Sequence, residues 1–160
     1  NSLVLSKGVL ELTVVDAKLT RSTNMFSNMS PFITISHKKR KMKTKVADYQ
    51  DKTPAFNNSF QLDIENTNEL VTLRGWHQGT FKADPIGFCQ LPVSALMINA
   101  VLGVEFHFLD TNQQVGSVKI STKFTPEGSD QYEIEKKRLE DEKESQAKEL
   151  AELKEKADEY

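Results

Sequence analysis

Hydrophobic and polar residues alternate along most of the first 125 positions of the chain. Leu10, Leu12 and Val14 are separated by Glu11 and Thr13, and this period of two is typical of a strand with one buried face. Turn-forming Asn, Asp and Pro residues separate further segments of the same kind. The pattern predicts eight strands, at residues 8–16, 31–37, 42–47, 58–64, 69–75, 86–91, 104–109 and 116–124. Because no long helical period interrupts them, we predict an antiparallel, all-β sandwich of two sheets, with one short helical turn within 92–102.

The C-terminal segment has a different pattern. Residues 130–160 contain no Gly or Pro and are rich in Glu, Lys, Leu and Ala, which favour helix. Acidic residues precede lysines at i,i+4, as in Glu133–Lys137 and Glu144–Lys148, and such pairs stabilise helices. We therefore predict a β-domain over residues 1–128 and a charged α-helix over 129–160, with Ser129 as its N-cap.

The apolar stripe of the predicted helix is thin. One heptad frame runs through Tyr132, Leu139, Gln146, Leu153 and Tyr160. In this frame the second core position of the heptad is occupied by Lys136 and Lys143. A sustained coiled coil needs apolar residues at both core positions over three to four heptads. Two interpretations stay open: a solvated charged helix, or a weak coiled-coil segment that pairs with another helix or docks on a partner.

Composition and charge set further bounds. The chain of 160 residues has a net charge of −2, with 28% charged and 38% hydrophobic residues, as in soluble globular proteins. The charge is uneven: residues 1–128 carry +3 and residues 129–160 carry −5. No apolar run approaches the roughly 18 residues that span a bilayer. With no signal peptide at its start, the chain is expected to be cytoplasmic, and its lack of an initial Met leaves open that it is a fragment.

Residues that could carry catalysis are sparse. Cys89 is the single cysteine, which excludes an internal disulfide and a cysteine-based zinc site, and we expect a core thiol. His37, His77 and His107 are scattered, and we assign them to a basic turn, a loop and a solvent-facing strand position. Neither a Gly-rich phosphate loop nor a Gly-x-Ser-x-Gly elbow occurs. We predict neither an enzyme nor a bound cofactor or metal.

Six short motifs carry a resemblance to a known family. In chain order they lie at residues 8–18, 28–32, 41–46, 53–60, 84–87 and 115–127. Each motif alone is weak, but in this order they resemble the C2 domain, a calcium- and phospholipid-binding β-sandwich. The likeness covers residues 8–127 and is similar to small single-domain plant C2 proteins of type II topology. It implies an eight-stranded antiparallel C2-type sandwich ahead of the charged helix.

The resemblance also implies a calcium site with five aspartates at the loops. Carried over by position, these fall on Asn24, Ser30, Trp76, Gln78 and Asp84. Only one of the five is an acid, and neutral oxygens alone do not offset the loss of calcium's hydration shell. We therefore expect a degenerate site and binding that does not depend on calcium.

A basic cluster is the most prominent remaining feature. Six of the nine residues at 37–45 are basic: Lys38, Lys39, Arg40, Lys41, Lys43 and Lys45. Strand alternation places Lys41, Lys43 and Lys45 on one face. The resemblance implies that this region binds phosphoinositide headgroups, and cations near an anionic membrane are attracted to it. An acidic protein surface is an alternative partner, and an exposed hairpin that protects a sheet edge is a third interpretation. Nucleic acid is disfavoured, because aromatic residues do not interleave with these charges.

Three aromatic residues are predicted near the loop tips, namely Phe26, Trp76 and Phe81. They could insert into a bilayer interface or anchor a protein partner. For Trp76 a third interpretation is packing over the base of the loops.

Together these features predict a calcium-independent C2 interaction module. Its expected role is an adaptor or scaffold element of a larger assembly, cytoskeletal or ciliary by family-level analogy, that docks through the basic hairpin, the loop tips and the helix. The alternative is a constitutive, peripheral membrane module that binds anionic phospholipids or phosphoinositides.

Overall fold

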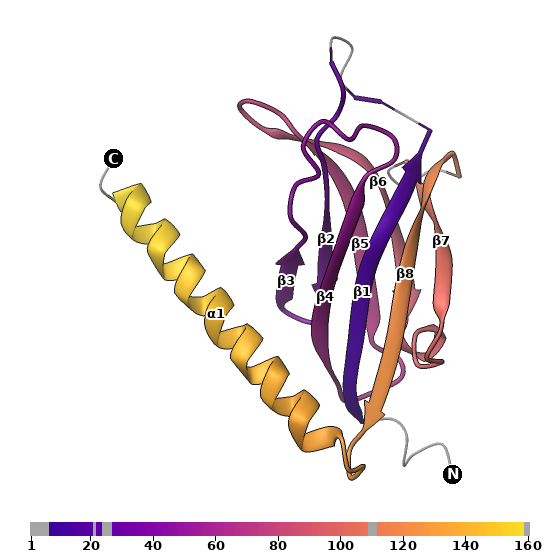
Figure 1. The fold of residues 1–160 in the computed structure, drawn as a ribbon, viewed down its shortest axis with the longest axis vertical. Helices are drawn as coiled ribbons and strands as arrows, with labels where there is room; N and C mark the ends of the chain where they lie inside the picture. The colour runs from indigo at the N-terminus through magenta and orange to yellow at the C-terminus, as the bar shows by residue number, and fades with distance from the viewer. Residues whose placement is uncertain (1–6, 21, 24–26, 109–111, 159–160) are drawn as a thin grey trace.

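The computed structural model describes residues 7–20, 22–23, 27–108 and 112–158. This part of the chain forms eight strands followed by one long helix, as Figure 1 shows. The strands are β1 (Gly8–Leu19), β2 (Pro31–His37), β3 (Arg40–Lys43), β4 (Ala55–Ile64), β5 (Leu70–Gln78), β6 (Ala83–Pro92), β7 (Val101–His107) and β8 (Gln114–Pro126). The helix is α1 (Tyr132–Asp158), and a short 3-10 turn, Val93–Ala95, lies within the predicted helical-turn segment. The predicted all-β class with a C-terminal helix is confirmed.

The strands are antiparallel and follow the order β3-β2-β5-β6-β7-β8-β1-β4. Among the described residues a single pair, Phe88 with His107, joins β6 to β7. The order therefore divides there into two four-stranded layers, with β4, β1 and β8 lying in front of β2 and β5 in Figure 1. Their inner faces meet in one apolar core. Fully buried members from β1, β2 and β4 include Leu10, Leu12, Ile35 and Leu62, the inward positions of the period-two pattern.

The third strand differs from its prediction at 42–47. A two-residue turn with Lys38 at a φ of 53° lets His37 pair with Arg40, so β3 begins two residues earlier. It ends at Lys43, because the Ile33 amide donates to Thr44 Oγ1 at 2.9 Å instead of to a main-chain carbonyl. The alternation itself holds: Met42 and Thr44 are buried, while Lys41, Lys43 and Lys45 are exposed.

The helix α1 packs against the outer side of β4, β1 and β8 and then continues away from the sandwich (Figure 1). Its contact side is formed by Tyr132, Glu135, Leu139, Glu142 and Gln146, which are buried or half-buried. The helix starts three residues after Ser129, whose hydroxyl donates to the Pro126 carbonyl at 2.7 Å. The Ser129 side chain is therefore not the predicted N-cap.

This contact changes the interpretation of the heptad frame. Tyr132, Leu139 and Gln146 lie on one side of the helix as predicted, but that side faces the protein's own sandwich. The second row of contacts is Glu135 and Glu142, rather than Lys136 and Lys143, which are exposed. The later frame positions, Leu153 and Tyr160, lie outside the described side chains. Pairing of α1 with another helix remains a prediction.

Candidate functional site

The described positions of the predicted calcium site are engaged in other contacts. The Ser30 amide donates to His77 Nδ1 at 2.9 Å, and its hydroxyl oxygen accepts from the Tyr49 amide at 2.9 Å. The Gln78 side chain donates to the Gly79 carbonyl, and Asp84 Oδ1 lies 3.8 Å from Lys82 Nζ. Asn24 lies outside the described residues. Across the described ranges no cluster of three or more His, Cys, Asp or Glu side chains could hold a metal ion.

His77 was predicted in a loop, but it lies near the end of β5 and is buried. Its Nδ1 accepts the hydrogen bond that the Ser30 amide donates. The imidazole thus holds the start of β2 against the end of β5, where the resemblance implied calcium ligands. No pattern in the sequence indicated this contact, because β5 extends three residues beyond its predicted end.

The six basic residues of the hairpin have different environments. Lys38 Nζ lies 3.1 Å from Glu65 Oε1, and His37 Nε2 lies 2.7 Å from Glu69 Oε1. His37, predicted as part of the basic turn, is therefore buried and paired with an acid, and burial lowers its pKa despite the carboxylate.

Arg40 is held by the helix. Its Nη2 donates to Glu142 Oε1 at 2.9 Å and to Gln146 Oε1 at 3.0 Å, while Nη1 donates to the Gln61 carbonyl at 2.7 Å. The four remaining cations, Lys39, Lys41, Lys43 and Lys45, are exposed. The predicted cluster is thus four exposed lysines beside two cations already paired with acids.

Aromatic rings border these lysines on the outer side of the β3-β2-β5-β6 layer. The rings of Phe32 and Trp76 are stacked, with centroids 6.4 Å apart and planes 14° apart. Lys43 Nζ lies 4.4 Å from the Phe32 centroid, and Arg74 Cζ lies 5.9 Å from that of Phe88. We call this surface the cation–aromatic face. Its members are Phe32, Lys41, Lys43, Arg74, Trp76 and Phe88.

Strand pairing explains why these side chains meet. Lys43 lies opposite Thr34, which lies opposite Arg74, which in turn lies opposite Phe88. Residues paired directly across strands project from the same face of a sheet, so this row alternates with the inward Ile33, Ile35 and Leu73. Sequence reasoning missed Phe32, Arg74 and Phe88, although the odd–even alternation places Phe32 and Arg74 opposite the apolar positions.

Trp76 was predicted at a loop tip, and its position is instead on the sheet. Trp76 belongs to β5 and lies opposite Phe32 of β2 and Pro85 of β6. Its Nε1 donates to Thr34 Oγ1 at 3.0 Å. Phe81 does lie in the turn between β5 and β6, with 98% of its surface exposed. Phe26 lies outside the described residues. A contact role for Phe81 remains a prediction.

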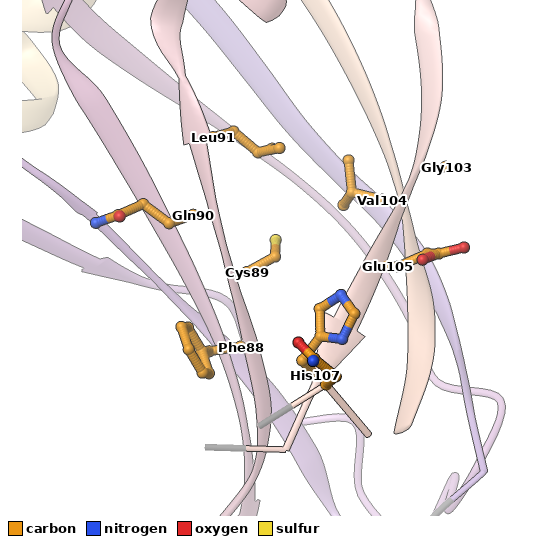
Figure 2. Close-up of a pocket in the computed structure, with 9 residues that line it drawn as sticks. Phe88, Cys89, Gln90, Leu91, Gly103, Val104, Glu105 and His107 are labelled. Carbon is orange, nitrogen blue, oxygen red and sulfur yellow. The ribbon is translucent and has the colours of Figure 1, made fainter. Parts of the chain in front are cut away.

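A hollow of about 470 Å³ opens where β6 and β7 separate. Figure 2 shows Cys89, His107 and Glu105 around it, with the Glu105 side chain directed away from the histidine ring. Burial raises the pKa of the Cys89 thiol to about 12, so the nucleophilic thiolate is not formed near neutral pH. His107, predicted to face solvent, is half-buried at this hollow.

The fold and this surface define a β-sandwich binding module with exposed cations over aromatic rings that are buried or half-buried. Residues 8–108 match the C2 domain family, so the chain belongs to that family. This is a family of generally non-catalytic binding modules. The part of the chain that the structure describes contains no helix that is long and apolar enough to cross a membrane.

Related proteins are found in plants. The chain is 28% identical to Synaptotagmin-4 of Arabidopsis thaliana over 125 residues, which is 77% of the chain and 22% of that protein. It is 23% identical to the 16 kDa phloem protein 2 of the same plant, covering 74% of the chain and 82% of that protein. The chain thus spans about a fifth of the synaptotagmin and most of the phloem protein.

Solved structures show the same fold. A single C2 domain of plant Extended Synaptotagmin 1 matches with a TM-score of 0.68 and 16% identity, over 76% of this chain and 97% of that one. A C2 domain-containing protein from a putative elicitor-responsive gene matches with a TM-score of 0.61 and 20% identity, over 76% and 91% of the two chains.

Proposed function

We propose that the chain is a peripheral membrane-binding module that recognises anionic lipid headgroups through the cation–aromatic face and without calcium. The observation that carries this proposal is the row of exposed lysines, Lys41, Lys43 and Lys45, beside the Phe32–Trp76 stack. Each cation near an anionic leaflet contributes about 1 kcal/mol. The half-buried Trp76 ring offers apolar surface to the interface between headgroups and acyl chains, while its N–H is bonded to Thr34.

The same geometry supports calcium independence. A calcium bridge between loop and lipid needs six to eight oxygen ligands. Ser30 is instead committed to His77 and Tyr49, and the Trp76 indole provides no oxygen. Exposed lysines can supply the attraction by themselves, which makes it depend on salt, since exposed charges are screened beyond about 8 Å at physiological ionic strength.

The test is co-sedimentation with vesicles of phosphatidylcholine alone or mixed with phosphatidylserine, in calcium or in chelator, at low and physiological salt. We expect binding to the anionic vesicles that is insensitive to chelator and weakened by salt. The triple substitution Lys41→Gln, Lys43→Gln and Lys45→Gln should abolish it. The matched control is Lys18→Gln, Lys119→Gln and Lys123→Gln, an equal charge change on exposed lysines of β1 and β8. An equal loss of vesicle binding in the two triple variants would contradict a localised site.

The second candidate is an adaptor that docks on an acidic protein surface through the same hairpin, the loop tips and α1. Two observations favour it: Phe81 is 98% exposed, and α1 continues away from the sandwich (Figure 1). Such an adaptor would bind a glutamate-rich peptide by the same three lysines and leave anionic vesicles unbound. A scaffold role in a cytoskeletal or ciliary assembly stays a prediction.

A further inference from the structure

The contact between α1 and the sandwich is built mainly from charged and polar groups. Leu139, with 3% of its surface exposed, is the apolar side chain that the described part of the helix buries. Around it the Arg138 guanidinium lies 3.0 Å from Glu135 Oε1 and 3.9 Å from Glu11 Oε2. The Glu142 carboxylate accepts one hydrogen bond from the Arg40 guanidinium and another, at 3.0 Å, from the main-chain N–H of Gln61 in β4.

Several polar atoms in this contact lack partners. Among the described residues, the buried side-chain atoms without a hydrogen-bond partner are Arg40 Nε, Gln61 Oε1, Glu135 Oε2 and His107 Nδ1. Three of these four lie between α1 and the sandwich. Each costs free energy while the helix is docked, because water would satisfy it if the helix moved away.

The ionised form of Glu142 is also poorly compensated. Burial raises the pKa of its carboxyl group, although the Gln61 amide and Arg40 both stabilise the charged form. Near neutral pH the carboxylate therefore loses more hydration than its partners return. A hollow of about 430 Å³ between the turn at Lys38–Arg40 and Lys143 of the helix further interrupts the contact. These features favour a docking of α1 that can be reversed.

We propose that α1 is a reversible latch at the edge of the lipid-binding layer: docked, it holds Arg40 and places an acidic segment beside the β2–β3 hairpin, and anionic headgroups release it. This inference rests on the proposed function and names its regulation. The helix segment, residues 129–160, carries a net −5 next to a domain of +3. Headgroups compete with Glu142 for Arg40, and release removes the opposing charge from the lipid-facing hairpin.

The decisive variant is Leu139→Glu, which places a charge at the one buried apolar contact of the described part of the helix. Ser145→Glu adds the same charge at an exposed position of the same helix and is the matched control. The probe is vesicles of equal parts phosphatidylcholine and phosphatidylserine at physiological salt. We expect Leu139→Glu to bind about fivefold more tightly despite its extra negative charge, the effect of one added cation near the surface. Ser145→Glu should bind no more tightly than the unmodified protein.

Release is measured independently by amide exchange at Gln61, whose N–H donates to Glu142. Adding Arg40→Gln to Leu139→Glu should remove the gain. If Leu139→Glu destabilises the sandwich, Leu139→Ser loosens the helix without adding a charge. Faster exchange at Gln61 with unchanged vesicle affinity would overturn the latch and leave the proposed function standing. If neither the variants nor the unmodified protein bind these vesicles, the membrane function itself fails.

Discussion

At the scale of single residues, Trp76 is the most informative side chain of the proposed site. It is the single tryptophan of the chain, and its ring stacks on Phe32 at the cation–aromatic face. The indole is half-buried, so its surroundings change when a membrane covers this face. Its fluorescence therefore reports on docking without any engineered label.

We predict that anionic vesicles shift the Trp76 emission to shorter wavelength, in chelator as well as in calcium, because the indole leaves water. The shift should be lost in the Lys41, Lys43 and Lys45 triple variant and absent with phosphatidylcholine vesicles. Binding in sedimentation with unchanged emission would place the contact on another surface of the protein.

His37 provides a second residue-scale prediction, on stability against pH. Its pKa is lowered from 6.5, first by burial, while the Glu69 carboxylate at 2.7 Å acts in the opposite direction. A lowered pKa means that the unfolded chain takes up the proton first as pH falls. The stabilising contribution of neutral His37 is thus complete above pH 6.5 and is lost as pH falls through the folded pKa.

We therefore expect the urea midpoint of the protein to fall between about pH 7.5 and 5.5, and the fall to be smaller in His37→Asn. Glu142 acts in the opposite sense. Its pKa is raised above 4.5 by burial, so its contribution is greatest below that pH and declines as pH rises. A slope in His37→Asn equal to that of the unmodified protein would assign the loss to other groups.

At the scale of elements, the eight strands and the helix were predictable because burial imposes period two on strands and composition favours helix over 130–160. The residues at which each strand begins and ends were not predictable in the same way. β5 reaches Gln78 and β3 begins at Arg40, since cross-strand partners and the Lys38 turn decide where pairing stops. These shifts of a few residues moved Trp76 and His77 from loops into a strand.

The helix α1 was also only partly predictable from the sequence. Its existence follows from local sequence, but the surface on which it packs does not. The heptad positions Tyr132, Leu139 and Gln146 face the sandwich, because Arg40 and Gln61 supply groups that bind Glu142 there. These pairs join residues 102 and 81 positions apart, which no periodicity within the helix reveals. The lysines of the candidate site and Trp76 were named from the sequence, whereas placing Phe32 and Phe88 beside them required the sheet register.

At the scale of the whole molecule, the two layers meet at loops where calcium binding is expected for the family but few acids remain. The Ser30–His77 contact joins the start of β2 to the end of β5 across this region. In the part of this end that the structure describes, a protein hydrogen bond thus joins two neighbouring strands. The contact supports the proposal of a module that is always competent to bind, as opposed to one that waits for a calcium signal.

We predict that calcium leaves the melting temperature unchanged. A ligand present at a hundredfold its dissociation constant stabilises a protein by about 2.7 kcal/mol, which for a domain of this size raises the melting temperature by roughly 5–10 °C. Scanning calorimetry in millimolar calcium, in magnesium and in chelator measures this directly. Magnesium controls for general ionic effects, because its octahedral preference suits a different site. A rise that is specific to calcium and reversed by chelator would show that Asp84 and neutral oxygens suffice, and calcium control of the membrane face would have to replace constitutive binding.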